Sequence, residues 1–130
     1  MMAEGNRKKT HQAPITAILA YDLRFYEHLP RLYPHQPDAP FWFSSSELVA
    51  REAAVKNSSL QAGYFIMAAR ALGLDCGPMG GFDAEAIARE FFPNMPYEIN
   101  LVCNLGYGDK SQLHRRLPRL SFQEACSILL

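Results

Sequence analysis

The sequence predicts an α+β fold, in which a mixed sheet of two strands is flanked by one long helix and several shorter ones. A strand is predicted over residues 14–21, a short apolar run rich in β-branched side chains that ends at Asp22. A second strand is predicted over residues 97–107. Alternation along it should place three apolar side chains on one face, namely Ile99, Leu101 and Cys103.

A long helix is the third feature behind this prediction. Ser44 and Glu47 have capping-box spacing, and the helical pattern then runs to Leu72. Gly73 follows, as is typical at the end of a helix. Residues 60–72 are apolar almost all round, so this helix must be surrounded, and part of the cover is expected from another subunit.

The remaining segments are predicted as follows. Asp83 caps a helix over residues 84–92. Residues 22–43 carry four prolines and six aromatic side chains and should form an extended loop. Residues 110–119 form a basic, irregular connection, and residues 121–130 a short terminal helix.

The composition fits one globular, soluble domain. Of 130 residues, 48% are hydrophobic and 20% charged, and the 13 basic and 13 acidic residues cancel. The chain therefore has no net field that would attract nucleic acid or an anionic membrane, and its neutrality favours an oligomer. No apolar run approaches the roughly 20 residues of a membrane helix. Cys76, Cys103 and Cys126 are odd in number and form no CxxC pair, which predicts a cytoplasmic protein without a disulfide framework.

The stretch Gly73–Asp83 is the strongest candidate for a functional element. Its glycines allow the main chain to approach a flat ligand or another chain closely, and Pro78 stiffens it. A side-chain-poor loop with free amides suits a planar heteroaromatic ligand. The alternative is an ordinary helix end followed by a turn.

Several segments together resemble the FMN-dependent nitroreductase family, and the resemblance spans the chain from about Ala3 onward. They are residues 14–22 (PITAILAYD), 68–74 (AARALGL), 76–83 (CGPMGGFD), 104–108 (NLGYG) and 116–119 (RLPR). Residues 20–27 (AYDLRFYE) and 57–64 (NSSLQAGY) resemble the branch of malonic semialdehyde reductases in particular.

This resemblance implies a nitroreductase-like domain over residues 14–130, preceded by a disordered lead-in over residues 1–13. Family members begin with an Arg/Ser-rich phosphate-binding helix and an Asn-containing flavin loop, neither of which is found before Pro14. The chain is therefore expected to correspond to the C-terminal two-thirds of the family domain, without the N-terminal helices, and to form a homodimer with the flavin at the subunit interface.

The resemblance also implies a cofactor site. Pro78, Met79, Gly80 and Gly81 would lie along the isoalloxazine ring, with a backbone amide at the flavin N5, and Arg116 would bind the FMN phosphate. A fixed donor at N5 tunes the ring, and a guanidinium matches phosphate oxygens. For Arg116 the alternative is a solvated charge in a basic turn. No side chain is required as a catalytic group.

Other residues with reactive or aromatic side chains have structural roles as alternatives. Cys76 beside the glycine loop could be a nucleophile, but nothing in the sequence identifies a base, so a small buried residue is favoured. His11, His28 and His35 show no metal spacing, and no metal site is predicted. Trp42, with its aromatic neighbours, could line a pocket or fill a hydrophobic hole.

The predicted function is that of an FMN-dependent oxidoreductase. NAD(P)H would reduce the flavin, which would then reduce a small aldehyde such as malonic semialdehyde, giving 3-hydroxypropionate, or a nitro compound, in a ping-pong reaction. One alternative is a truncated, non-catalytic remnant that folds or dimerises without FMN. The other is a thiol-dependent enzyme that uses Cys76.

Overall fold

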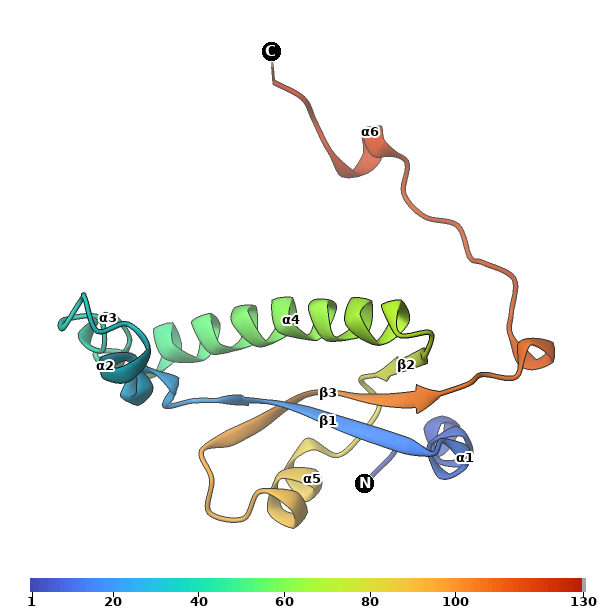
Figure 1. Cartoon of the computed structure of the whole chain (residues 1–130), viewed down its shortest axis with the longest axis horizontal. Coiled ribbons are helices and arrows are strands. Elements are labelled where there is room, and N and C mark those ends of the chain that lie inside the picture. Colours follow the sequence, from blue (N-terminus) through green and yellow to red (C-terminus); the bar gives the residue numbers. More distant parts are fainter. Residues whose placement is uncertain (130) are drawn as a thin grey trace.

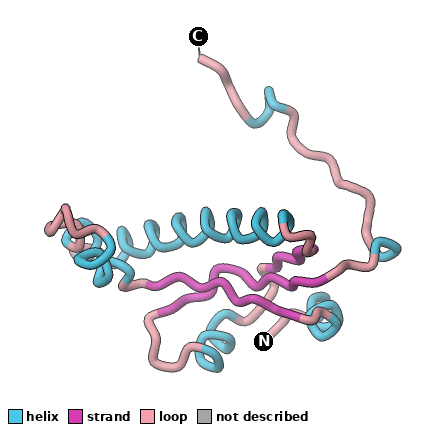
Figure 2. Tube along the Cα trace, viewed as in Figure 1, coloured by secondary structure: helices cyan, strands magenta, loops and turns pink. Residues whose placement is uncertain are grey.

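The computed structural model describes residues 1–129. Figure 1 shows a three-layered body, with a twisted sheet between the long helix α4 (Glu47–Ala71) on one face and α1 (Glu4–Gln12) and α5 (Ala84–Phe91) on the other. From the end of the sheet, residues 107–129, here called the arm, leave the body (Figure 2). The predicted α+β class is confirmed.

The sheet has three strands in the order β1-β3-β2, with β1 at Ile15–Asp22, β2 at Asp75–Met79 and β3 at Tyr97–Gly106. Both predicted strands are present, each within one residue of its expected ends. Both pairings are antiparallel, so the prediction of a mixed sheet is wrong for the described strands. The prediction of a loop throughout 73–83 is also wrong, because β2 occupies its middle.

A bulge changes the face on which the side chains of β3 lie. Leu19 pairs with Leu101, but the next residue, Ala20, pairs with Ile99. Beyond the bulge, alternation is reversed. Ile99 therefore shares the α5 face with Val102, whereas Cys103 lies on the opposite face, and the prediction that Ile99, Leu101 and Cys103 share one face is wrong.

Helix α4 packs on the sheet through a stripe of small side chains. Its buried residues are Ala50, Ala54, Ser58, Ala62 and Ala69. The N-cap is Ser46, whose hydroxyl accepts from the amide of Val49 over 3.4 Å, and not the predicted Ser44, which ends the short helix α3 (Phe41–Ser44). Gly73 has φ +83° just after the C-cap, as predicted.

The hydrophobic core lies between the sheet and α5. Met79, Ile87, Ile99 and Val102 are its buried members. Asp83 caps α5 as predicted, with its carboxylate accepting from the amide of Ala86 over 2.9 Å. This arrangement positions the end of β2, and the residues that follow it, against α5.

Residues 1–13 are not the disordered lead-in that was predicted, because residues 4–12 form α1. The segment is tied to the turn after β2: the Ala3 amide donates to the Gly81 carbonyl over 3.0 Å, and the Asp83 amide to the Met1 carbonyl over 2.7 Å. Further along α1, the Thr10 hydroxyl faces the Met79 sulfur at 3.9 Å. Tertiary contacts therefore order a segment that has no apolar periodicity of its own.

Residues 22–43 form short helical turns and not an extended loop. They contain η1 (Phe25–His28), α2 (Leu29–Leu32) and α3. Pro30 lies in the first turn of α2, where its missing amide costs nothing. Trp42 is 52% exposed, so it does not fill a hydrophobic hole in this chain, and its role in lining a pocket stays a prediction.

The arm contains one turn of 3-10 helix, η2 (Lys110–Gln112), and one short helix, α6 (Phe122–Ala125). Ser121 and Glu124 form a capping box at the start of α6, within the predicted terminal helix. Among the described residues, no helix is both long enough and apolar enough to cross a membrane.

Candidate functional site

The four predicted ring-contacting residues have different environments. Pro78 and Met79 are the last residues of β2, opposite Cys103 and Val102. Pro78 is exposed on this edge strand, whereas the side chain of Met79 is only 8% exposed and belongs to the core. Met79 can therefore offer a ligand its main chain alone.

Gly80 provides the open surface of the segment. It is exposed, and a Cβ built on it would meet no atom within 4 Å. The space beside its main chain is thus open to a ligand, which fits a flat group lying against this residue.

Gly81 is hydrogen-bonded to the N-terminal segment of the chain. Its carbonyl accepts from the Ala3 amide over 3.0 Å and from Asn6 Nδ2 over 3.1 Å. A Cβ on Gly81 would lie 2.8 Å from Asn6 Nδ2, so α1 occupies the place of a side chain. The end of β2, the core residue Met79 and α1 together fix the main chain around Gly80.

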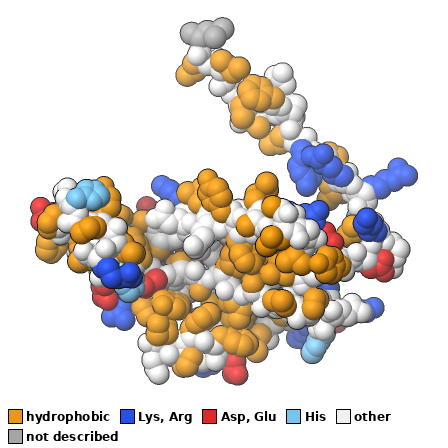
Figure 3. Space-filling view, in the orientation of Figure 1, with side chains coloured by type: hydrophobic (Ala, Val, Ile, Leu, Met, Phe, Trp, Pro, Cys, Tyr) orange, Lys and Arg blue, Asp and Glu red, His pale blue; other side chains and the backbone are white. Residues whose placement is uncertain are grey.

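Arg116 lies on the arm and is exposed. Within one chain the fold does not bring it to the segment 78–81, since the arm leaves the body (Figure 1). Basic side chains gather on the arm near the body, with apolar ones further along (Figure 3). Arg119 donates to the carbonyls of Leu117 and Pro118, so its guanidinium bonds within the arm.

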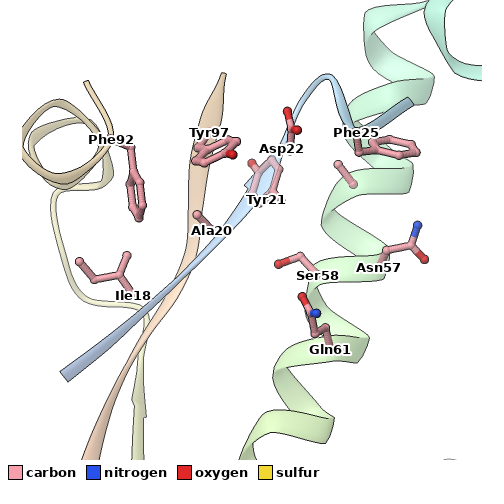
Figure 4. A pocket seen from close by; sticks show the side chains of 11 residues that line it. Ile18, Ala20, Tyr21, Asp22, Phe25, Asn57, Ser58, Gln61, Phe92 and Tyr97 are labelled. Atoms are coloured by element: carbon pink, nitrogen blue, oxygen red, sulfur yellow. The ribbon is translucent and has the colours of Figure 1, made fainter. Parts of the chain in front are cut away.

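A cleft of about 580 Å³ lies beside the free edge of β1, between α4 and the turn before β3. Figure 4 shows it facing side chains of β1 and α4. Its lining residues are Ile18, Ala20, Tyr21, Asp22, Phe25, Ala54, Asn57, Ser58, Gln61, Phe92 and Tyr97. The two segments that resemble the malonic semialdehyde reductases, 20–27 and 57–64, therefore meet in one cleft.

A charged network lies at this end of the sheet. The hydroxyl of Tyr21 donates to Glu98 Oε2, which also accepts from the Arg51 guanidinium of α4. Burial raises the pKa of Tyr21, and the hydrogen bond to Glu98 raises it further. For Glu98, burial acts to raise the pKa, but the hydrogen bonds from Arg51 and Tyr21 outweigh it and hold the pKa below its usual value. The carboxylate thus stays charged beside a neutral phenol.

The three cysteines have different environments. Cys76 is half-buried, with its sulfur 3.9 Å from the Ile66 carbonyl, and burial raises the pKa of the fully buried Cys103. Cys126 is exposed on the arm. Among residues 1–129, no cluster of three or more His, Cys, Asp or Glu side chains is placed to hold a metal ion.

Sequence reasoning missed two parts of this region. The contact between α1 and Gly81 joins residues 75 or more positions apart, and the polar sequence of α1 carries no periodic signal for it. The Tyr21–Glu98–Arg51 network was also missed, although the register of the two predicted strands could have placed Tyr21 opposite Glu98.

Comparisons with known proteins give the family. The sequence profile described as "Nitroreductase family" matches residues 1–107. The chain is 56% identical over 128 residues to a protein of Ralstonia nicotianae named "Putative NADH dehydrogenase/NAD(P)H nitroreductase"; the match covers 98% of this chain but 65% of that relative. The chain thus spans slightly less than two thirds of the relative's length.

Solved structures share the fold. A nitroreductase family protein of Streptococcus pneumoniae superposes with a TM-score of 0.80 at 17% identity, covering 99% of this chain and 71% of the other. A crystal structure described as a "putative nitroreductase in complex with FMN", from Exiguobacterium sibiricum, gives a TM-score of 0.83 at 16% identity, covering 98% of this chain and 68% of the other. With the profile match over most of the chain, these likenesses lead to one conclusion: the chain belongs to the nitroreductase family.

Proposed function

We propose that this chain binds FMN and works as an NAD(P)H-dependent oxidoreductase on a small carbonyl or nitro compound. The relative from Ralstonia is named for NAD(P)H, and the structure from Exiguobacterium contains FMN, which supports the assignment. Bound FMN would supply the redox chemistry, by accepting a hydride from NAD(P)H and passing one to the second substrate. The two substrates would use the site in turn.

The observation that carries the proposal is the open space at Gly80. Around it the main chain is fixed by β2, by the buried side chain of Met79 and by the hydrogen bonds of Gly81 to α1. A rigid, bare stretch of main chain can lie against a flat ring at contact distance without reorganising when the ring binds. Pro78, exposed and with a fixed φ, would extend this surface.

Arg116 would neutralise the FMN phosphate, and we propose that it does so for a second copy of the chain. Arg116 lies on the arm, which leaves the body of its own chain (Figure 1). Helix α4 leaves a large apolar stripe uncovered, with Leu60, Tyr64 and Met67 each more than 60% exposed. A homodimer would cover this stripe and bring an arm to a neighbouring site.

For the acceptor we propose malonic semialdehyde, reduced to 3-hydroxypropionate. This rests on the resemblance of residues 20–27 and 57–64 to that branch, and on their meeting in the cleft beside β1. We place the protein in the cytoplasm, in keeping with its free thiols.

Flavin titration of the purified chain tests the proposal. FMN fluorescence should be quenched on binding to the wild type, and Gly80→Leu should weaken that binding at least about tenfold, since the new side chain fills the space that the ring needs. Gly5→Leu is the matched control: Gly5 also has nothing within 4 Å of an added Cβ, but it lies on α1. Equal FMN affinity in wild type and Gly80→Leu would remove Gly80 from the site. A folded wild-type chain that binds no FMN would support the alternative, a non-catalytic remnant.

A further inference from the structure

One carboxylate joins three elements at the root of the arm. The Gly108 amide, two residues beyond β3, donates to Oδ2 of Asp75, the first residue of β2, over 2.8 Å. The other oxygen, Oδ1, accepts from Arg70 in the last turn of α4. The same guanidinium nitrogen donates to the Leu74 carbonyl over 3.0 Å. The end of α4, the start of β2 and the exit from β3 are therefore held together through Asp75.

Close packing restricts the same stretch of chain. A Cβ on Gly106 would lie 2.8 Å from Cδ of Pro14, and a Cβ on Gly108 would lie 3.3 Å from Oδ2 of Asp75. The chain leaves the sheet in contact with a rigid ring and with a hydrogen-bonded carboxylate. Its direction at this point is thus set by packing as well as by hydrogen bonds.

Beyond Gly108, the hydrogen bonds of the arm within residues 107–129 are local. Asp109 accepts from Ser111, Arg119 donates to carbonyls of its own turn, and Ser121 pairs with Glu124. No described hydrogen bond ties this part of the arm to the body. The described hydrogen bonds between the arm and the body are therefore confined to the root of the arm.

We propose that Asp75 is a positioning residue, which holds the Gly108 amide against Arg70 and so sets the direction in which the arm presents Arg116. The destination of Arg116, a flavin phosphate on a second copy, rests on the proposed function. The hydrogen-bonded group of Gly108, Asp75 and Arg70, here called the clamp, does not. The hydrogen bond from Gly108 and then that from Arg70 hold the pKa of Asp75 below its usual value, so the clamp is charged at neutral pH.

Hydrogen exchange without FMN tests the clamp. Asp75→Ala should speed exchange of the Gly108 amide by at least about twofold. The control is Asp109→Ala, which also removes an exposed carboxylate that accepts from a backbone amide, but one that bonds only within the arm. It should speed exchange at Ser111 and leave Gly108 unchanged. Asp75→Asn keeps the shape of the side chain and one oxygen acceptor. Its exchange rate at the Gly108 amide should lie between those of the wild type and Asp75→Ala.

The affinity for FMN then tests whether the clamp positions Arg116. Asp75→Ala should weaken FMN binding in the wild-type background and have no further effect in the Arg116→Ala background. Both substitutions remove the same contribution to FMN binding, that of Arg116. A merely structural role would weaken binding equally in both backgrounds and would overturn the positioning role. Equal exchange at Gly108 in Asp75→Ala and wild type would overturn the clamp itself. A wild type that binds no FMN refutes the proposed function, whereas the exchange rates still decide the clamp.

Discussion

Tyr21 and Glu98 lie directly opposite each other on β1 and β3, and the phenol donates its hydrogen bond to the carboxylate at 2.5 Å. The same carboxylate oxygen accepts from Arg51 of α4. Glu98 therefore connects both strands to the long helix at the end of the sheet where the cleft opens. A half-buried carboxylate in such a position couples the stability of the fold to pH.

Replacing Glu98 by Gln should make stability less dependent on pH in the acid range. The folded-state pKa of Glu98 lies below its ordinary value of 4.5, so its stabilising contribution is present above pH 4.5 and is lost as the pH falls through the folded-state pKa. At pH 7 the variant should lose a few tenths to about 1 kcal/mol of unfolding free energy, because the pair is partly exposed. Once the pH lies below the folded-state pKa of Glu98, the two proteins should converge.

Urea unfolding at a series of pH values measures this effect. Glu90→Gln is the control, since Glu90 is exposed on α5 and has no described ion pair or hydrogen bond within residues 1–129. A constant difference between wild type and Glu98→Gln from pH 7 to pH 3 would show that the network does not titrate as argued.

Gly106 should not tolerate even a methyl group. An added Cβ would lie 2.8 Å from Cδ and 2.9 Å from Cγ of Pro14, whose ring cannot rotate away. Gly106→Ala should therefore lower the free energy of unfolding by about 1–3 kcal/mol, the usual cost of overpacking. A Cβ added at Gly80 would meet no atom within 4 Å. Gly80→Ala should therefore change the free energy of unfolding by less than about 0.5 kcal/mol.

The double variant Pro14→Ala/Gly106→Ala identifies the cause of that loss. Removing the ring should recover much of the loss, so the effects of the two substitutions on the urea midpoint should not add. Additive effects would mean that Gly106 is required for another reason.

How far the fold could be predicted differs between its elements. The strands 14–21 and 97–107 and the helix ending before Gly73 carry local signals, and each is found close to its predicted place. Residues 75–79 carry Gly77 and Pro78, which lower strand propensity, so β2 was missed. Proline is accepted there because β2 is an edge strand, with one side free of ladder hydrogen bonds.

The candidate site could be predicted only in part, for a physical reason. A bare stretch such as Gly80–Gly81 is visible in the sequence as missing side chains. The sequence does not show what surrounds this stretch, because Asn6 of α1, which hydrogen-bonds to Gly81, is 75 positions away in the sequence. The place of Arg116 depends on the path of the arm, for which the residues 110–119 carry no local signal.

The uncovered face of α4 leads to the last prediction, which concerns association. Leu60, Tyr64 and Met67 follow one another at helical spacing of four and three residues, and are 61%, 77% and 68% exposed. Exposed apolar stripes of this kind are typical of interaction surfaces. In the proposed homodimer, the double variant Tyr64→Lys/Met67→Lys should therefore shift the chain from dimer to monomer, because two buried like charges on each helix would oppose pairing.

Sedimentation velocity at several protein concentrations measures this shift, and far-UV circular dichroism checks that α4 persists. The matched control is Phe91→Lys/Met95→Lys, which introduces the same charges at two apolar residues near the end of α5 that are 54% and 49% exposed. The control should remain dimeric at concentrations where the α4 variant is monomeric. If both variants sediment like a dimeric wild type, then α4 is not the interface. A wild type that is monomeric at all concentrations would contradict the proposed homodimer.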